Sequence, residues 1–234
     1  MVTAAATTTY GWVLDLGKED YARTLDYQHG LVKMRHTGMA RDTIILVEHP
    51  PVMTVGRDGH EENYKDLPIQ PFFVERGGDV TFHGPGQLVV YFIFNLTRRG
   101  RDLHKFISDI QEGIIRVLAE YGVEARRVGE NTGVWVEKQK VASIGVAVKQ
   151  WISYHGTAIN LNTKLADFEK INPCGLNAEV MTSLQKLTGR KVDMKNFADR
   201  LMFHYSAVFE TVFTPVNLDS LAEDLESQAG GYGV

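Results

Sequence analysis

Cys174 is the only cysteine in the 234-residue chain, and it stands in the segment Asn172-Pro173-Cys174-Gly175-Leu176. A lone cysteine is most often a small apolar core residue. Here the flanking proline and glycine predict a bend that presents the sulfur instead of packing it, and residues 179–187 downstream can begin a helix. A helix N-terminus lowers the pKa of a thiol. Cys174 is therefore a candidate nucleophile.

Glycine is dense in a second segment, RGGDVTFHGPGQ at 76–87, where arginine, aspartate, threonine and histidine are interleaved with it. Glycine lets a backbone approach a ligand closely and point its N–H groups at it. Two ordinary turns flanking a strand would explain the same pattern equally well. The segment matches neither G-x-x-x-x-G-K-[ST] nor G-x-G-x-x-G at a strand-to-helix junction, so nothing in it requires ATP or NAD.

Lys140 and His155 are further candidates for acid–base chemistry. Lys140 opens the apolar stretch KVASIG at 140–145, and His155 precedes a glycine in YHGTAIN at 154–160. A lysine at the start of an apolar strand is more often a solvated end residue than a catalyst, and a lone histidine is an equally weak signal. Neither residue identifies a reaction by itself.

These segments, with two more, resemble the lipoyl(octanoyl) transferases, also called the lipoate-protein ligase B family. The resemblance extends from about Leu46 to about Arg190. Six segments match in the same order along the chain: HPPVMTVGR (49–57), RGGDVTFHGPGQLVVY (76–91), ENTGVWV (130–136), KVASIGV (140–146), YHGTAINLN (154–162) and NPCGL (172–176). Collinear matches of this kind are not expected by coincidence.

The resemblance implies an octanoyl-[acyl-carrier-protein]:protein N-octanoyltransferase, which carries out the first step of endogenous lipoate biosynthesis. The donor is octanoyl-acyl-carrier-protein. The acceptors are lysines on the lipoyl domains of 2-oxoacid dehydrogenase E2 subunits and on the glycine-cleavage H protein. The family uses neither ATP nor metal, since phosphopantetheine arrives on the carrier-protein substrate. The fold implied is the one shared by biotin-protein ligases and class II aminoacyl-tRNA synthetase cores.

The resemblance also implies the roles of individual residues. Cys174 would carry the acyl group as a thioester, and Lys140 would lower the thiol pKa and act as acid and base. The residues expected to contact the acyl chain are Arg76, Gly77, Gly78, Asp79, Val80, Thr81, Phe82, His83, Ser143, Ile144, Gly145, Gly156, Thr157 and Ala158. Two of them depart from the family pattern: Asp79 stands where Gln, Lys or Arg is usual, and Thr157 stands where Leu is usual.

Three other readings are compatible with parts of the pattern. An ATP-dependent lipoate or biotin ligase would use the same lysine but would need no cysteine. A non-catalytic module that binds acyl chains or lipoyl domains would explain the glycine-rich segment but not the cysteine between Pro and Gly. A cysteine hydrolase would need a histidine base, and both His83 and His155 are present.

Composition narrows the setting of this chemistry. The net charge is −4 and the isoelectric point is about 6.1, so no overall basic field attracts nucleic acid. One cysteine excludes an intramolecular disulfide framework. No apolar run approaches the roughly 20 residues of a membrane helix, and the start of the chain lacks the cationic region of a signal peptide. We expect a cytoplasmic monomer that binds neither nucleic acid nor membrane.

Two basic clusters could nevertheless dock an acidic carrier protein. One comprises Arg98, Arg99, Arg101 and Lys105, and the other is the pair Arg126 and Arg127. A solvated surface is the more common explanation of such clusters, and the sequence leaves both open.

Helical spacing and strand-like runs predict the elements that position these residues. Apolar residues recur with helical period over 102–121, 18–39 and 194–211, with Asp102 and Asp193 as N-caps. Strands are expected over 43–47, 87–96, 133–136, 141–149 and 152–161, with a turn at Lys138-Gln139. Strands followed by helices without regular alternation predict an α+β fold, with a mixed, mainly antiparallel sheet flanked by helices. We expect one catalytic domain over 1–216 with a short flexible start, and an acidic, glycine-ended tail over 217–234.

Overall fold

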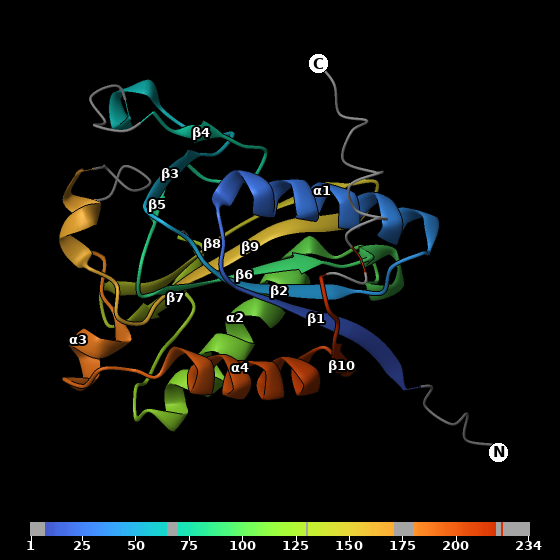
Figure 1. The fold of residues 1–234 in the computed structure, drawn as a ribbon. Helices are drawn as coiled ribbons and strands as arrows, with labels where there is room; N and C mark the ends of the chain where they lie inside the picture. The colour runs from blue at the N-terminus through green and yellow to red at the C-terminus, as the bar shows by residue number, and fades with distance from the viewer. Residues whose placement is uncertain (1–7, 65–69, 130, 171–179, 219–220, 222–234) are drawn as a thin grey trace.

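A seven-stranded sheet organises the part of the chain that the computed structural model describes, residues 8–64, 70–129, 131–170, 180–218 and 221 (Figure 1). The strand order is β10-β1-β2-β6-β9-β8-β7. The strands are β1 (Thr9–Lys18), β2 (Thr43–Glu48), β6 (Gln87–Ile93), β7 (Gly133–Val136), β8 (Gln139–Lys149), β9 (Ile152–Asn160) and β10 (Thr211–Pro215). β1 runs parallel to both β2 and β10, and the remaining pairs are antiparallel. The predicted mixed, mainly antiparallel sheet is confirmed.

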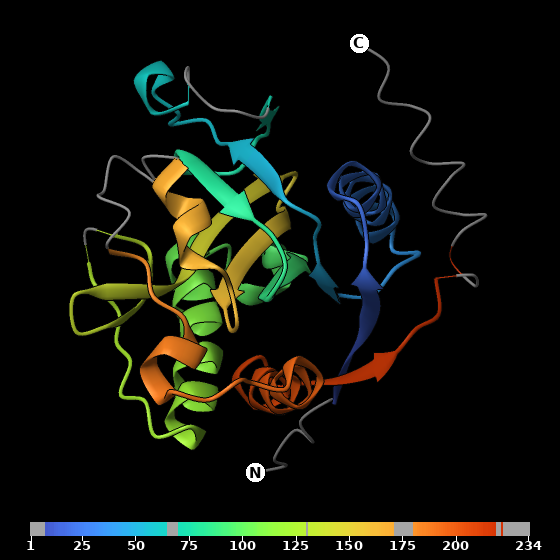
Figure 2. The same cartoon turned by 60° about the vertical axis from the view of Figure 1, so that its left-hand side comes forward.

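Helices cover both faces of this sheet. Helix α1 (Tyr21–Thr37) lies on one face, and α2 (Leu103–Glu120) and α4 (Met194–Val208) lie side by side on the other (Figures 1 and 2). The predicted caps are present, because the Asp102 and Asp193 carboxylates accept the Lys105 and Asn196 N–H groups at 2.8 and 3.0 Å. With both faces covered, every residue of β6 and β9 is buried, which explains why 87–96 reads as a continuous apolar run.

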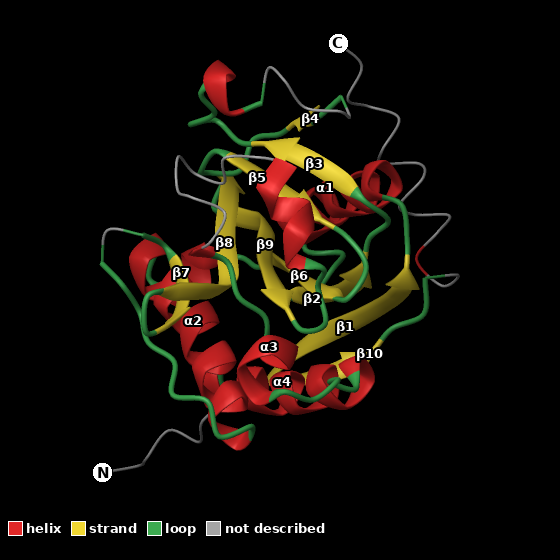
Figure 3. Cartoon of the chain, turned by 90° about the vertical axis from the view of Figure 1, so that its left-hand side faces the viewer, coloured by secondary structure: helices red, strands yellow, loops and turns green. Residues whose placement is uncertain are grey.

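A second, three-stranded sheet lies on the same side of the large sheet as α1 (Figure 3). Its order is β4-β3-β5, with β3 (Val52–Val55), β4 (Phe72–Phe73) and β5 (Val80–His83). Met53, Val55, Val80 and Phe82 pack from this sheet against Phe168 of η3 (Leu165–Lys170). The short elements η1 (Glu61–Asn63), η2 (Leu96–Arg99) and α3 (Leu184–Thr188) complete the described part. The glycine-rich segment therefore belongs to a structure that projects over the large sheet.

Both ends of the chain differ from the expectation. β1 begins at Thr9, inside the stretch expected to be flexible, and pairs with β2 and β10. Leu221, inside the expected tail, is buried and packs with Leu218 against the cluster between α1 and the sheet. Residues 219–220 and 222–234 lie outside the described part. No helix in the described part is long and apolar enough to cross a membrane.

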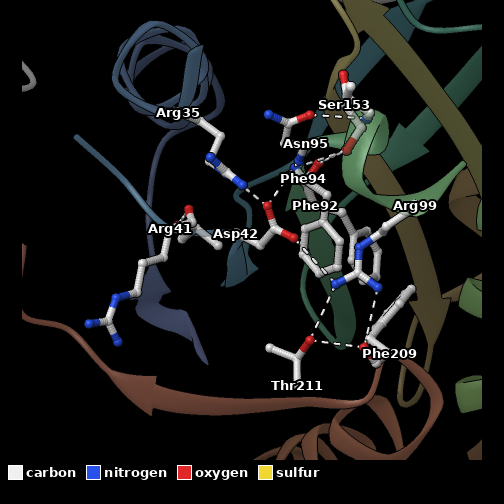
Figure 4. Close-up of polar contacts among 12 residues, drawn as sticks. Arg35, Arg41, Asp42, Phe92, Phe94, Asn95, Arg99, Ser153, Phe209 and Thr211 are labelled. Carbon is white, nitrogen blue, oxygen red and sulfur yellow. Dashed lines mark hydrogen bonds and ion pairs between the residues drawn. The ribbon is translucent and has the colours of Figure 1, made fainter. Parts of the chain in front are cut away.

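A buried ion-pair network corrects the interpretation of the first basic cluster (Figure 4). Asp42 accepts from Arg35 Nε at 2.7 Å and from Arg99 Nη2 at 3.2 Å. Arg99 also donates to the Phe209 carbonyl and to the Thr211 hydroxyl, both at 3.2 Å. Arg99 therefore joins β2 to the end of α4 and to β10. It is not part of an exposed docking patch.

The other basic residues are partly neutralised at the surface. Lys105 pairs with Asp109 at 2.7 Å, and Arg127 pairs with Glu112 at 2.6 Å. Arg101 lies over the Trp151 ring, with its guanidinium carbon 5.4 Å from the ring centroid. The two clusters thus do not form one free cationic surface in the described part of the chain.

Candidate active site

A pocket of about 440 Å³ lies between the small sheet and the large one. Its floor comes from β6, β8 and β9, its roof from the loop before β5, and its inner end from α1. Of the residues expected to contact the acyl chain, the structure brings eleven to this pocket: Arg76, Gly77, Gly78, Thr81, His83, Ser143, Ile144, Gly145, Gly156, Thr157 and Ala158. Lys140 lines the same pocket.

The floor is long because β8 contributes to it from Lys140 to Val146. Six strand steps span about 20 Å. The roof approaches this floor closely, since the Gly77 N–H donates to the Val146 carbonyl at 3.1 Å. A Cβ on Gly145 would lie 2.8 Å from the Gly77 oxygen, so only glycine fits at that point. The result is an elongated channel with Lys140 toward one end and Val146 toward the other.

Lys140 is buried, with 5% of its surface exposed. Its Nζ lies 5.1 Å from the centroid of the Trp135 ring, a separation at which the ring face attracts an ammonium. Gly133, on the paired strand β7, makes room for the side chain, because a Cβ there would lie 2.9 Å from Lys140 Cε. The sequence therefore builds a specific compartment for this lysine, which is not a solvated strand end.

The chain that follows residues 171–179 is attached to Lys140. Met181 forms a parallel bridge with Lys140, and the Thr182 N–H donates to the Lys140 carbonyl at 3.0 Å. Met181 also lines the pocket. Cys174 lies outside the described residues, so the expected pairing of Cys174 with Lys140 stays a prediction.

A chain of buried hydrogen bonds links His83 of β5 to Thr182, the residue bonded to Lys140. His83 Nδ1 lies 2.8 Å from Gln87 Oε1. Gln87 Nε2 donates to Asn160 Oδ1 at 2.9 Å, and Asn160 Nδ2 donates to the Thr182 carbonyl at 3.1 Å. Each amide group thus has one oriented role. The chain couples the position of Thr182, beside Lys140, to β5, β6 and β9.

The imidazole of His83 is neutral in this setting. Burial, the largest cause, lowers its pKa from 6.5 to about 3. Because the Gln87 oxygen can only accept, Nδ1 carries the ring proton and Nε2 holds a lone pair. His83 therefore does not supply a second N–H to an oxyanion, and it shapes the pocket.

The other ring groups near the inner end are also uncharged. Burial lowers the pKa values of His49 and His155 and raises those of Tyr21 and Tyr91. His49 Nδ1 donates to the Glu19 carbonyl at 2.8 Å, which leaves Nε2 to accept from the Tyr91 hydroxyl at 2.9 Å. An inner end made of neutral rings suits an apolar chain.

Arg76 is the expected site residue of the roof whose charged side chain lines the pocket. Its guanidinium donates to the Thr54 carbonyl and to the Thr54 hydroxyl, both at 2.8 Å, and to the Gly77 carbonyl at 3.1 Å. Arg76 therefore fastens the roof to β3. Its charge is satisfied by protein oxygens rather than directed at a ligand by the contacts described.

Three expected site residues do not line the pocket. Val80 and Phe82 are turned into the core of the small sheet. Asp79, one of the two departures from the family pattern, is buried and faces the segment 60–63. Its carboxylate accepts from the His60 N–H at 3.2 Å and from the Asn63 amide. Asp79 therefore bears on loop structure and not on the polarity of the acyl pocket.

Thr157, the other departure, does line the pocket. Its hydroxyl donates to the Ser143 carbonyl on β8 at 2.8 Å. The hydroxyl is thus satisfied within the sheet and imposes no unpaired polar group on a ligand.

Several pocket residues were not assigned from the sequence. Five of them lie inside the segments that match the family: Arg57, Val89, Tyr91, Asn131 and Thr132. Their positions in these motifs could have identified them as pocket residues. Tyr21, Leu103 and Ile107 lie on helices whose periodicity indicates only burial. Among the described residues, no group of three or more His, Cys, Asp or Glu side chains is arranged to hold a metal ion.

Comparisons with known proteins agree with this architecture. The model of the lipoyl protein ligase A/B catalytic domain matches residues 20–206. The octanoyltransferase of Geobacter metallireducens is 47% identical over 182 residues, which cover 78% of this chain and 85% of the relative. That of Syntrophotalea carbinolica is 43% identical over 199 residues, covering 85% and 94%.

Solved structures extend the likeness at the level of the fold. Lipoate-protein ligase A bound with ATP superposes with a TM-score of 0.77 at 14% identity, covering 95% of this chain and 93% of the ligase. The biotin protein ligase of Aquifex aeolicus gives a TM-score of 0.52 at 12% identity, covering 86% and 70%. By its fold, its pocket and its sequence, this chain belongs to the lipoyl protein ligase A/B catalytic domain family.

Proposed function

We propose that this chain transfers an octanoyl group from octanoyl-acyl-carrier-protein to the acceptor lysine of lipoyl domains, through a thioester on Cys174. The single observation that carries the proposal is the pocket of about 440 Å³ whose inner end is lined by uncharged rings, with buried Lys140 toward one end. The octanoyltransferases described above, at 43 and 47% identity, support the acyl group and the reaction class. The E2 subunits of 2-oxoacid dehydrogenases and the glycine-cleavage H protein are the acceptors proposed.

The first half-reaction loads the enzyme. The Cys174 thiolate attacks the carbonyl of the donor thioester and forms a C–S bond. The bond to the phosphopantetheine sulfur breaks, and that sulfur takes a proton from the Lys140 ammonium. The products are acyl-Cys174, a free phosphopantetheine thiol and a neutral Lys140. Met181, seven positions after Cys174 in the sequence, bridges to Lys140, which supports this pairing.

The second half-reaction unloads it. The neutral amine of the acceptor lysine attacks acyl-Cys174, and its surplus proton passes to Lys140. The Cys174 thiolate leaves, so the amide forms while the thiolate and ammonium are regenerated. One residue thus acts as acid and then as base, which microscopic reversibility requires. Because conversion of a thioester to an amide is downhill, the proposed reaction needs no ATP.

The uncharged rings at the inner end of the pocket account for the acyl specificity proposed. Each buried methylene contributes about 0.8 kcal/mol, and no charged ring opposes an apolar chain at the inner end. Oxyanion stabilisation is assigned to the backbone N–H group of Gly175 or Leu176, because the N–H groups of Gly77 and Gly78 already donate to the Val146 carbonyl and the Asp58 carboxylate. Losing one such donor raises a barrier by about 2.7–4 kcal/mol.

The test is product analysis by mass spectrometry. The protein is incubated with octanoyl-acyl-carrier-protein and a lipoyl domain, in parallel with lipoate plus ATP, and with and without acceptor. Octanoylation of the acceptor lysine without ATP is expected. Lipoylation that depends on ATP would instead identify a ligase, and release of free octanoate regardless of acceptor would identify a hydrolase.

A further inference from the structure

Arg57 is the only exposed cation among the described residues that line the pocket. The exposed rim consists of Arg57, Asp58, Leu103 and Thr132. The two other pocket residues with basic side chains, Arg76 and Lys140, are buried. Any anionic group that stays outside the channel while an acyl chain enters it therefore meets one positive charge at this rim.

The backbone that carries Arg57 is fixed to the roof. The Arg57 N–H donates to the Arg76 carbonyl at 3.0 Å, and the Asp58 N–H donates to the Gly78 carbonyl at 3.3 Å. In return the Gly78 N–H donates to the Asp58 carboxylate at 2.7 Å. The Gly56 N–H also donates to the Asp79 carbonyl at 3.3 Å. Movement of the loop would therefore break four hydrogen bonds.

Asp79 fixes the far side of the same loop. Its backbone carbonyl accepts from Gly56, while its carboxylate accepts from the His60 N–H and the Asn63 amide. The acidic residue that distinguishes this chain from its family thus serves to hold the loop 56–63. Arg57 starts from a backbone that is already ordered, which reduces the cost of ordering it on binding.

The guanidinium itself is uncommitted. In the described portion of the chain it makes no hydrogen bond, ion pair or ring contact. Two carboxylates are nearby, because Asp58 is the next residue and the Asp79 backbone is bonded to Gly56. Those two carboxylates accept from backbone and amide N–H groups instead. An arginine on a fixed backbone, at a pocket rim and without a partner, is suited to an anion supplied by a ligand.

We propose that Arg57 binds the phosphate of the phosphopantetheine arm that presents the acyl thioester, an inference that rests on the proposed function. The donor has an anionic phosphodiester outside the acyl chain, whereas the acceptor brings a lysine of the opposite sign or no charge. Guanidinium is planar and binds phosphate oxygens in pairs. Arg57 therefore favours binding of the anionic donor over binding of an acceptor lysine at the same rim.

The experiment compares two donors that differ only in the phosphate. Octanoyl-4′-phosphopantetheine and octanoyl-pantetheine are offered to wild type and to Arg57→Ala, with transfer to a lipoyl domain as the readout. Loss of charge-assisted hydrogen bonds to phosphate is expected to lower kcat/KM about tenfold or more for the phosphorylated donor. The octanoyl-pantetheine value should not change. Arg57→Lys should recover part of the loss.

Arg190→Ala is the matched control, because Arg190 is exposed and does not line the pocket. It should leave both donors unchanged. An equal loss for both donors in Arg57→Ala would overturn the proposal, and so would a loss seen with octanoyl-acyl-carrier-protein but not with free octanoyl-phosphopantetheine. Calorimetric binding of the two free donors gives the same ratio without turnover. Failure of transfer by wild type would contradict the proposed function, while the binding ratio would still decide the role of Arg57.

Discussion

The carbonyl oxygen of Lys140 accepts a hydrogen bond from the Thr182 N–H at 3.0 Å. This bond joins the strand that carries the proposed acid–base residue to the chain that follows the proposed nucleophile. The same threonine offers its carbonyl to Asn160 at 3.1 Å. Thr182, which is buried, thus connects the Lys140 backbone to the Asn160 side chain.

Replacing Lys140 should remove the acid–base function without emptying the pocket. Lys140→Ala is expected to lower kcat by about 10²–10⁴-fold, the usual contribution of a positioned acid or base. Alkylation of Cys174 as a function of pH should give a higher apparent thiol pKa in the variant, because the ammonium that favours the thiolate is gone. An unchanged alkylation profile would contradict the ion pair.

Asn160 should control activity through Thr182. Asn160→Ala leaves Gln87 Nε2 and the Thr182 carbonyl without the contacts seen at 2.9 and 3.1 Å, and each buried group left unsatisfied costs about 1–3 kcal/mol. Both the free energy of unfolding and kcat are expected to fall, while KM for the donor changes little.

Asn162→Ala is the matched control for that experiment. Asn162 bridges the Val192 carbonyl and N–H, both at 2.8 Å, away from the pocket lining. It should lower the free energy of unfolding by a similar amount but leave kcat near wild type. If both variants lose activity in proportion to stability, Asn160 has no positioning role.

Asp79 should affect the rim loop rather than acyl-chain length. Asp79→Ala removes the acceptor for the His60 N–H and the Asn63 amide, with an expected loss of about 1–3 kcal/mol in the free energy of unfolding. The preference among hexanoyl, octanoyl and decanoyl donors should not change, since Asp79 does not line the pocket. Thermal unfolding and a donor series measure the two effects. A shifted length preference would place Asp79 in acyl recognition after all.

Stability should decline on mild acidification because of buried histidines. His83 has its pKa lowered from 6.5 to about 3, and burial also lowers the pKa values of His49 and His155. Below about pH 6.5 the unfolded chain takes up protons at these rings and the folded chain does not. The free energy of unfolding should therefore fall as pH decreases below about 6.5, and His83 should contribute about 1.4 kcal/mol per pH unit until its folded pKa of about 3 is reached.

His83→Gln tests this attribution. The variant should show a shallower dependence of unfolding free energy on pH between 6.5 and 4, measured by urea titration. His104→Gln, a substitution on the exposed side of α2, controls for the change of residue type. A slope equal to wild type in His83→Gln would contradict a neutral buried imidazole.

Local patterns predicted the elements whose signals lie within a few residues. The helix expected over 102–121 is α2, because its apolar stripe and its cap at Asp102 are encoded in consecutive turns. β1 was missed, since Gly11, Asp15 and Gly17 interrupt its alternation and its stability comes from pairing on both sides. The expected turn at Lys138-Gln139 is one residue too late, because Gln139 already belongs to β8.

Long-range pairing explains the remaining differences. Arg99 is 57 residues from Asp42 in sequence, so its local basic neighbours suggested a surface cluster. Asp79 was assigned to the pocket from its place in a motif, yet its hydrogen bonds with the His60 N–H and the Asn63 amide turn it away. Eleven of the residues expected from the motifs line the pocket. The motifs contain no information about the direction in which each side chain points.

Intact-mass spectrometry of the enzyme alone shows whether Cys174 carries the acyl group. Wild type mixed with octanoyl-acyl-carrier-protein, without acceptor, should gain the mass of one octanoyl group. That mass should disappear when a lipoyl domain is added, with equal gain on its lysine. Cys174→Ala should gain none. An adduct that persists in Cys174→Ala, or transfer to the lipoyl domain by that variant at the wild-type rate, would contradict the account.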